Sequence, residues 1–137
     1  MDIEVLDLIY LFVGLGGMAG SLLRYLISVI VVHLWGGDFP IGTLIINLSG
    51  AFLLGWVTSH LVIPRKLNPT LITALTTGVI GSYTTFSTFC YETVHLYERG
   101  EYLFVFLYSF VSFYGGLFLV KAGMDLSEKG SKSRRII

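Results

Sequence analysis

Charged residues are scarce in this sequence. They make up 13% of its 137 residues, whereas a soluble domain contains about 25%. Hydrophobic residues make up 54%, and the mean hydropathy is +0.77. The formal net charge is zero, so nothing in the charge balance favours a nucleic-acid partner. This composition indicates a protein embedded in a lipid bilayer.

Cysteine and proline are scarce as well. The single cysteine, Cys90, excludes an internal disulfide and leaves too little for a thiolate metal cluster. Three prolines against 16 glycines suit closely packed membrane helices. The first ten residues carry acids before the apolar run and no lysine or arginine, which is not the start of a cleaved signal peptide. We therefore expect this segment to stay in the mature protein.

Four apolar windows cover most of the chain: residues 8–32, 39–64, 67–91 and 102–120. Each is close to or above the roughly 20 residues that a membrane-spanning helix needs. The breaks between them are short and rich in turn-forming residues. The sequence predicts an all-α membrane protein with one domain of four transmembrane helices over residues 1–126. Residues 127–137 are expected to form a basic, disordered cytoplasmic tail.

The distribution of lysine and arginine predicts an orientation. With four spans, both termini and the loop between the second and third spans lie on one side of the membrane. That side carries Arg65, Lys66, Lys121, Lys129, Lys132, Arg134 and Arg135. The other side carries Arg99 alone. Because basic loops stay in the cytoplasm, we expect both termini there.

Four helices enclose little volume, so a transport role predicts an oligomer. The first window contains the motif GLGGMAG, in which Gly16 and Gly20 lie one helical turn apart. Small residues at this spacing let two backbones approach closely. The motif fits an interface between subunits or packing within one subunit, and the sequence leaves both open.

Polar residues inside the windows are candidates for the lining of a path. Arg24 is the one charged residue inside a window, and it serves either as an anchor at the interface or as part of an electropositive vestibule. Asn47 either joins helices or offers its N–H groups to an anion. Tyr108 and Ser112, one turn apart in the last window, form a stripe of hydroxyl groups.

The segment GSYTTFSTF, residues 81–89, is unusually polar for a membrane helix. Glycine and threonine weaken a helix, and a local break here would free backbone carbonyls that suit a hard cation such as Na⁺. Phe86 and Phe89 lie three residues apart, hence on one face, with hydroxyl side chains beside them. The positively polarised edges of two phenyl rings could line an anion path.

None of the four windows contains aspartate or glutamate. A proton-driven exchanger or an exporter of cationic drugs normally needs such a carboxylate, so a lining of donors alone favours an anion. The alternatives are a small four-helix multidrug or cation exporter, and a membrane scaffold without transport. The sequence has no nucleotide-binding motif and no catalytic triad, so we expect no enzyme.

Three motifs occur in order, one per window: GxxGxxxRY (residues 17–25), GTLIIN (42–47) and GxxGSYTTFSTF (78–89). Together they closely resemble the Fluc/CrcB family of bacterial fluoride channels. The resemblance implies a fluoride-selective channel in the cell membrane that passively exports cytoplasmic fluoride and so lowers its toxicity. It also implies an antiparallel, dual-topology dimer with two pores at the subunit interface and a third helix broken near its middle.

The resemblance also implies roles for single residues. Those matched to the fluoride pathway are Phe86, Phe89, Asn47, Tyr108, Ser112, Thr85, Ser87, Thr88 and Arg24. The backbone carbonyls of Gly81 and Thr84 would hold a structural sodium ion that is not transported. Two positions depart from the family: Tyr83 replaces its usual leucine or phenylalanine, and Gly116 stands where some members have serine.

A dual-topology homodimer needs nearly balanced lysine and arginine on its two sides. The seven-to-one bias of this chain conflicts with that requirement. We therefore expect a fixed orientation, with an oppositely oriented homologue as the antiparallel partner rather than a second copy of the chain.

Overall fold

A computed structural model describes residues 3–64 and 67–133, and in these ranges the regular secondary structure is helical throughout. The first helix, α1, covers Ile3–Trp35, and the last, α6, covers Tyr102–Ser133. Between them lie α2 (Ile41–Val57), the π-helix η1 (Thr58–Val62), α3 (Pro69–Thr73), the π-helix η2 (Ala74–Ile80), α4 (Gly81–Tyr83) and α5 (Phe86–Glu98).

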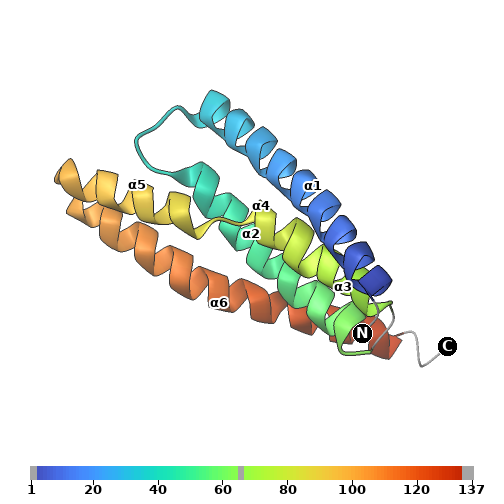
Figure 1. The fold of residues 1–137 in the computed structure, drawn as a ribbon. Helices are drawn as coiled ribbons and strands as arrows, with labels where there is room; N and C mark the ends of the chain where they lie inside the picture. Colours follow the sequence, from blue (N-terminus) through green and yellow to red (C-terminus); the bar gives the residue numbers. More distant parts are fainter. Residues whose placement is uncertain (1–2, 65–66, 134–137) are drawn as a thin grey trace.

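The helices lie side by side in one elongated bundle (Figure 1). α2 packs along α6, while α1 packs on η2 and α4. The first turns of α1 and the last turns of α6 lie at the same end of the bundle. An even number of membrane crossings would produce this arrangement.

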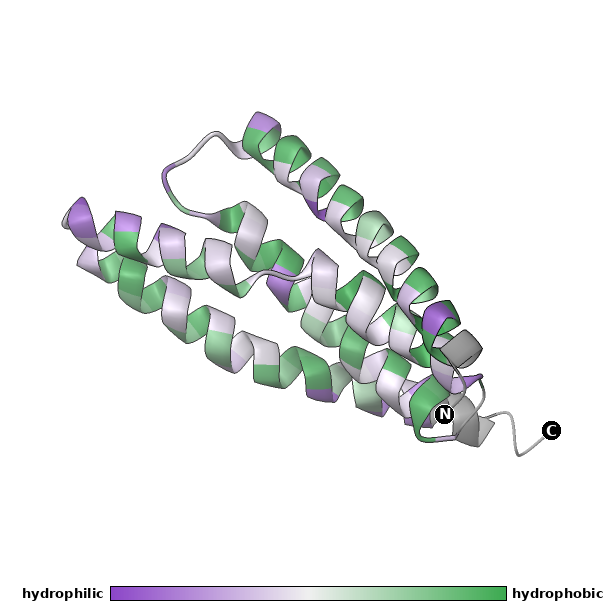
Figure 2. Ribbon diagram, viewed as in Figure 1, coloured by the Kyte–Doolittle hydropathy of each residue, from purple (hydrophilic) through white to green (hydrophobic). Residues whose placement is uncertain are grey.

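Three helical stretches in the described ranges are long and apolar enough to cross a membrane: Leu6–Trp35, Ile41–Val62 and Tyr102–Glu128. Figure 2 shows apolar residues spread over these helices, and only 6% of the most apolar window of the first and the last stretch is buried. Apolar surface of this extent needs lipid or another protein to cover it. The expected all-helical membrane protein is confirmed at this level.

The window expected to form the remaining span, residues 67–91, is not a single helix. α3, η2 and α4 follow one another without a gap from Pro69 to Tyr83. Thr84 and Thr85 then adopt extended backbone, with ψ angles of 159° and 125°, before α5 begins. That this composite segment crosses the membrane stays a prediction.

The last helix runs further than we expected. We placed a disordered tail over residues 127–137, but α6 continues to Ser133, and residues 134–137 lie outside the described part. No proline follows Pro69 in the sequence, so nothing in the backbone forces α6 to stop where its apolar run ends. Ser127, only 3% exposed, is still packed against the bundle.

Glycines determine how closely α1 approaches the rest of the bundle. A Cβ atom at Gly16 would lie 2.6 Å from the carbonyl oxygen of Ala74, and one at Gly20 would overlap that of Val79. Backbone atoms cannot move aside as a flexible side chain can. The GLGGMAG motif therefore packs helices within the subunit, which is one of the two roles that the sequence left open.

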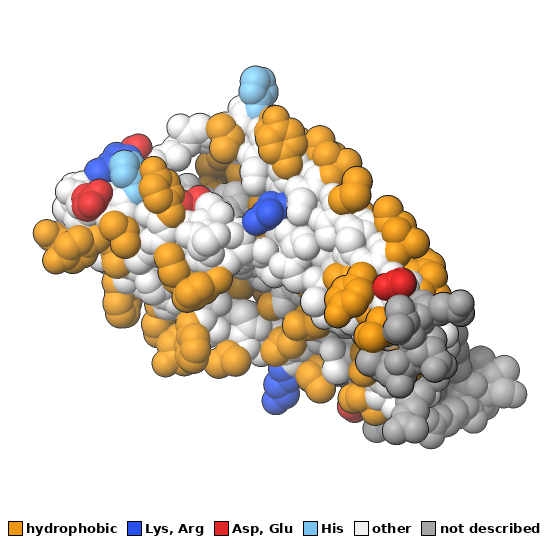
Figure 3. Space-filling model, in the orientation of Figure 1, with side chains coloured by type: hydrophobic (Ala, Val, Ile, Leu, Met, Phe, Trp, Pro, Cys, Tyr) orange, Lys and Arg blue, Asp and Glu red, His pale blue; other side chains and the backbone are white. Residues whose placement is uncertain are grey.

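Charged side chains gather where the α1–α2 loop meets the α5–α6 turn, at the end of the bundle away from the start of α1 (Figure 3). Arg99 lies 2.9 Å from Asp38 and 2.8 Å from Glu101. The hydrogen bond to Asp38, followed by the attraction of both carboxylates, raises the pKa of the Arg99 guanidinium. Exposed ion pairs add little stability, so we regard this contact as aligning the two connections.

Candidate functional site

The interruption between α4 and α5 lies against Asn47 on α2. The Asn47 Nδ2 atom donates to the carbonyl oxygen of Thr85 at 2.9 Å, and the Thr85 N–H donates to Asn47 Oδ1 at 2.8 Å. The side-chain amide thus pairs with both backbone groups of Thr85, as a neighbouring strand would. Of the two roles left open for Asn47, the structure shows the joining of helices. Its amide has two donor hydrogens, and one is used here.

This pairing leaves backbone carbonyls without their usual partners. In an unbroken helix the Gly81 carbonyl would accept from the Thr85 N–H, but that N–H donates to Asn47. The Thr84 carbonyl would accept from the Thr88 N–H, which instead donates to Thr85 Oγ1 at 3.2 Å. Gly81 and Thr84 both line an open groove of about 310 Å³ beside α2.

A cation in this groove would depend on carbonyl and hydroxyl oxygens. Among the described residues, no three His, Cys, Asp or Glu side chains lie together as metal ligands. Oxygen atoms of carbonyl groups are the ligands that hard cations prefer. The free carbonyls of Gly81 and Thr84 are therefore chemically suited to the ion that the family resemblance implies.

Three of the predicted pathway hydroxyls form one cluster at the start of α5. Thr85 Oγ1 lies 2.9 Å from Thr88 Oγ1 and 3.4 Å from Ser87 Oγ. Thr85 is the N-cap of α5, because its hydroxyl accepts from the Thr88 N–H. Thr85 is buried, while Ser87 is exposed. In this chain the cluster thus stabilises the start of the helix and leaves Ser87 open to a ligand.

Aromatic rings from α5 and α6 form a row. The ring centroids of Phe86 and Phe89 lie 5.9 Å apart at an interplanar angle of 27°, and those of Phe89 and Tyr108 lie 4.9 Å apart at 44°. Phe86 is 77% exposed, whereas Tyr108 is 0% exposed. The row therefore leads from the surface of the chain to its interior, with the two phenyl rings stacked.

A carboxylate that we did not predict lies at the inner end of this row. The Tyr108 hydroxyl donates to Glu92 Oε2 at 2.7 Å, and the Thr43 hydroxyl donates to Glu92 Oε1 at 2.8 Å. Our expectation that the polar lining contains donors alone is therefore wrong. The hydroxyl of Tyr108 is present, as predicted, but in this structure it is bound to an anion of the protein itself.

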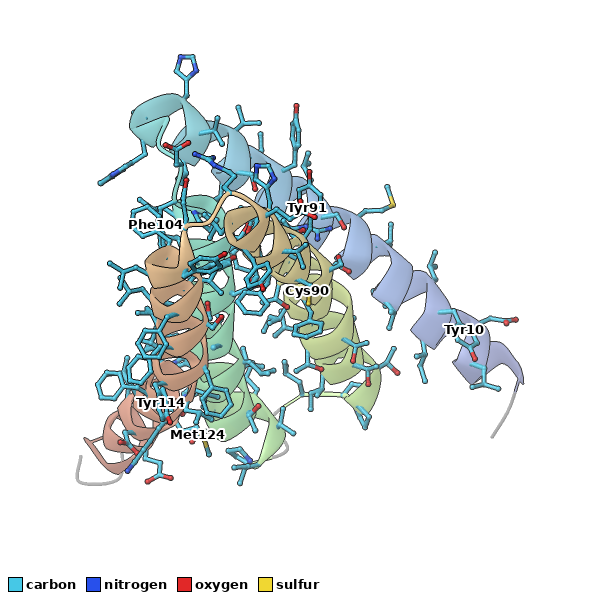
Figure 4. All side chains as sticks on the ribbon, turned by 90° about the vertical axis from the view of Figure 1, so that its left-hand side faces the viewer. Tyr10, Cys90, Tyr91, Phe104, Tyr114 and Met124 are labelled. Carbon is cyan, nitrogen blue, oxygen red and sulfur yellow. The ribbon has the colours of Figure 1, made fainter. Side chains whose placement is uncertain are left out.

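Glu92 was missed because the predicted window ended at Tyr91. α5 in fact runs on to Glu98 without interruption. Helical spacing was the signal that could have revealed it, since Glu92 follows Phe89 by three residues and Thr88 by four. Figure 4 shows α5, marked by Cys90 and Tyr91, with α6 on one side and α1 on the other.

Two predicted residues have no hydrogen-bond or ion-pair partner in the described part of the chain. Ser112 Oγ is buried and unpaired, one turn beyond Tyr108 on α6. Buried hydroxyls are normally hydrogen-bonded, so an unpaired one is available to a ligand. Arg24 is half-buried on α1, and its guanidinium contacts no acceptor in these residues. Both of its alternative roles stay open.

A cavity of about 490 Å³ opens beside Glu92. Its walls come from α1, the α1–α2 loop, the start of α2 and α5, and they include Asp38, Thr43, Thr88 and Glu92. Glu92 and its partner Thr43 therefore border a cavity, whereas Tyr108 is fully buried beside them. Tyr108, at the inner end of the row of rings, is connected to this cavity through its hydrogen bond to Glu92.

Comparison with known proteins identifies the relatives of this chain. The family model described as "CrcB-like protein, Camphor Resistance (CrcB)" matches residues 11–124, a range that contains every predicted pathway residue. A protein of Bacillus thuringiensis subsp. konkukian named "Fluoride-specific ion channel FluC 1" is 43% identical over 121 residues, covering 88% of each chain.

Two further relatives carry the same name. The protein of Bacillus cereus is 42% identical over 125 residues, which are 91% of this chain and 87% of the relative. The protein of Staphylococcus aureus is 42% identical over 123 residues, which are 90% of this chain and 82% of the relative. The similarity thus extends over nearly the whole length of both partners.

Proposed function

The chain belongs to the CrcB-like family, and we propose that it is a fluoride-selective ion channel through which cytoplasmic fluoride leaves the cell passively. Its relatives are named as fluoride-specific channels, and its three long apolar helices agree with a membrane protein. The observation that carries the proposal is the row of Phe86, Phe89 and Tyr108, with the unpaired Ser112 hydroxyl beyond it.

Fluoride is small and strongly hydrated, so a pore must replace its water with close hydrogen-bond donors. Ser112 offers a buried hydroxyl that has no partner among the described residues, and Tyr108 lies one turn away. The edges of Phe86 and Phe89 add weakly positive surface that excludes bulk water. A narrow path of this kind admits fluoride and penalises the larger chloride ion.

Glu92 holds two hydroxyl groups of this pathway in place. Its carboxylate accepts the same hydrogen bonds from Tyr108 and Thr43 that a passing fluoride ion would accept. We therefore expect both hydroxyls to turn from the carboxylate to the ion during permeation. Glu92 keeps these donors satisfied and oriented between ions, since buried donors without partners are costly.

A structural sodium ion fits the break between α4 and α5. The carbonyl oxygens of Gly81 and Thr84, which lack helical partners, would hold it. The ion would supply a fixed positive charge in the middle of the protein, and it would not be transported. Non-helical backbone at membrane depth is tolerated where protein or bound ions satisfy it, so this site supports the view that residues 69–98 form a broken third span.

A second subunit would complete the site. Phe86 is 77% exposed, and the groove with the free carbonyls is open on the same chain. The groove is not stable against lipid, because unpaired carbonyls are costly there. An antiparallel dimer would cover this face and form two pores, with the sodium ion shared at the centre.

The orientation of the chain stays a proposal that depends on its charge bias. We propose that the protein lies in the cell membrane with its termini in the cytoplasm and pairs with an oppositely oriented homologue. Of the basic residues behind the bias, Arg65, Lys66, Arg134 and Arg135 lie outside the described residues, as do the side chains of Lys129 and Lys132.

The test of the pathway compares two phenylalanines in proteoliposomes with a fluoride electrode. Phe86→Ile removes a ring from the row and should reduce fluoride efflux by tenfold or more, while dimer assembly is retained. Phe118→Ile is the control, because Phe118 on α6 is also exposed, at 71%, but is absent from the row. If both variants conduct like the wild type, the row is not a pathway, and if Phe86→Ile fails to assemble, core packing becomes the better explanation of Phe86.

A further inference from the structure

Tyr83, a departure from the family pattern, is a buried phenol at the end of α4. It is 4% exposed, and its hydroxyl lies 2.8 Å from Ser49 Oγ on α2. The Ser49 hydroxyl also contacts the Ile46 carbonyl oxygen at 3.1 Å, as a donor. A serine hydroxyl has a single hydrogen. Tyr83 is therefore the donor in its bond to Ser49.

The bond between Tyr83 and Ser49 is one of two side-chain attachments that join α2 to the segment around Thr84. Asn47 and Ser49 lie two residues apart on α2, and they bind Thr85 and Tyr83, the two neighbours of Thr84. Between them the Thr84 methyl group lies against Gly50, where a Cβ atom would overlap it. Tyr83, Thr84 and Thr85 are thus all in contact with α2, which fixes the backbone around Thr84.

The bond of Tyr83 to Ser49 joins two helices, whereas ordinary helix stabilisation acts within one helix. α4 has only three residues, and Thr84 is tied to the preceding turn through the Ile80 carbonyl, which accepts from both the N–H and the hydroxyl of Thr84 at 3.0 Å. A phenylalanine at position 83 would fill the same space. The hydroxyl adds a directional link that fixes α4 against α2.

We propose that Tyr83 is a positioning residue that sets the affinity for a cation at the Gly81 and Thr84 carbonyls. The proposal rests on the sodium site proposed above. Gly81 and Thr84 lie on either side of Tyr83 in the chain, so a rotation of α4 would move one carbonyl relative to the other. Cation binding requires several oxygens at once, and it should weaken before the helix unfolds.

The test measures sodium binding directly through thermal stability. A ligand that binds the folded state alone raises the melting temperature as its concentration rises. The purified wild-type protein in detergent is heated across a sodium chloride series at constant ionic strength, with N-methylglucamine chloride as the balance. The midpoint of the sodium-dependent shift gives an apparent sodium constant.

Four variants define the result. Tyr83→Phe should raise the apparent sodium constant about three- to tenfold, as expected for one lost hydrogen bond. Ser49→Ala should raise it at least as much, because it leaves the Tyr83 donor buried without an acceptor. The apparent sodium constant of the double variant should be no higher than the higher of the two single-variant constants, since both substitutions remove the same bond. Tyr10→Phe is the control: Tyr10 is 70% exposed near the start of α1 (Figure 4).

The same variants are then reconstituted to measure fluoride efflux at low and saturating sodium. The proposal expects Tyr83→Phe to lose flux at low sodium and to regain it at saturation. A lower melting temperature with an unchanged sodium constant would make Tyr83 merely structural and would overturn the proposal. Additive shifts in the double variant would do the same. A wild type that conducts no fluoride would instead refute the proposed function, and one that conducts without any sodium response would refute the sodium site.

Discussion

At the scale of single residues, competition for hydrogen bonds decides where the helix between α4 and α5 stops. The Asn47 side chain accepts the Thr85 N–H, which in a continuous helix would bind the Gly81 carbonyl. The Thr85 hydroxyl accepts the Thr88 N–H, which would bind the Thr84 carbonyl. Threonine and glycine make this segment a weak helix, so two side-chain acceptors suffice to interrupt it. Asn47 thus leaves the carbonyl of Gly81 free, and together with Thr85 it produces the break.

Asn47→Ala tests this account of the break. The substitution leaves both backbone groups of Thr85 unpaired, each at a cost of about 1–3 kcal/mol, unless the Thr85 N–H returns to Gly81 and the helix closes. We expect the variant to lose sodium-dependent stabilisation and at least tenfold of its fluoride flux. Hydrogen exchange at the Thr85 N–H distinguishes the two results, because exchange stays slow if the helix closes and becomes faster if the N–H is left unpaired. A variant with normal flux and a normal sodium response would contradict the assignment of Asn47.

Glu92 gives a second prediction at this scale. If its role is to hold the Tyr108 and Thr43 hydroxyls, Glu92→Gln keeps an acceptor oxygen and should retain fluoride flux within about threefold, whereas Glu92→Ala leaves two buried donors unpaired and should lose tenfold or more. Efflux of both variants from proteoliposomes gives the answer. Equal losses in the two variants would mean that the negative charge itself is required.

At the scale of helices, contacts between backbones decide the packing. The carbonyl oxygen of Val120 approaches Gly55, and that of Phe52 approaches Gly123, so closely that a Cβ atom at either glycine would overlap it. These contacts join α2 to α6, as Gly16 and Gly20 join α1 to η2. The bundle therefore depends on glycine at a few defined positions.

Gly20→Ala and Gly14→Ala form a matched pair on α1. The first places a methyl group on the Val79 carbonyl and should lower stability by about 1–3 kcal/mol or prevent folding. The second meets nothing within 4 Å, and alanine is the better helix former, so its stability should equal or slightly exceed that of the wild type. Melting temperatures in detergent check both. A stable Gly20→Ala protein would show that α1 is free to move away.

Helices were the most predictable part of this protein. The apolar windows located α1, α2 and α6, because length and hydropathy alone decide what can cross a bilayer. Helix ends were less predictable, since α5 and α6 continue into polar sequence that hydropathy cannot assign. For that reason Glu92 fell outside the window, although it binds Tyr108 in the structure.

The site was predictable in its members but not in its contacts. Spacing placed Phe86 with Phe89, and Tyr108 with Ser112, on common faces. It could not show that Asn47 would bind the backbone of Thr85, because that contact joins residues 38 positions apart. Pairings between helices depend on packing, which a single sequence does not encode in its periodicity.

At the scale of the whole molecule, the charge bias predicts a fixed orientation. A fluorescent reporter and a phosphatase reporter on the C-terminus distinguish cytoplasmic from external ends, and the bias predicts cytoplasmic ends in nearly all molecules. Reducing the bias from seven against one to two against one, by replacing Lys121 and the basic residues of the tail with glutamine, should produce a mixture. Equal populations for the unmodified chain would restore the dual-topology homodimer.

The central claim is that this chain forms a passive fluoride channel. The most direct measurement is halide efflux from proteoliposomes that contain the purified protein, read with fluoride and chloride electrodes in parallel and driven only by the ion gradient. The account predicts rapid loss of fluoride on addition of an ionophore that balances charge, and chloride loss no faster than from protein-free vesicles. Retention of fluoride, or equal release of both ions, would contradict it.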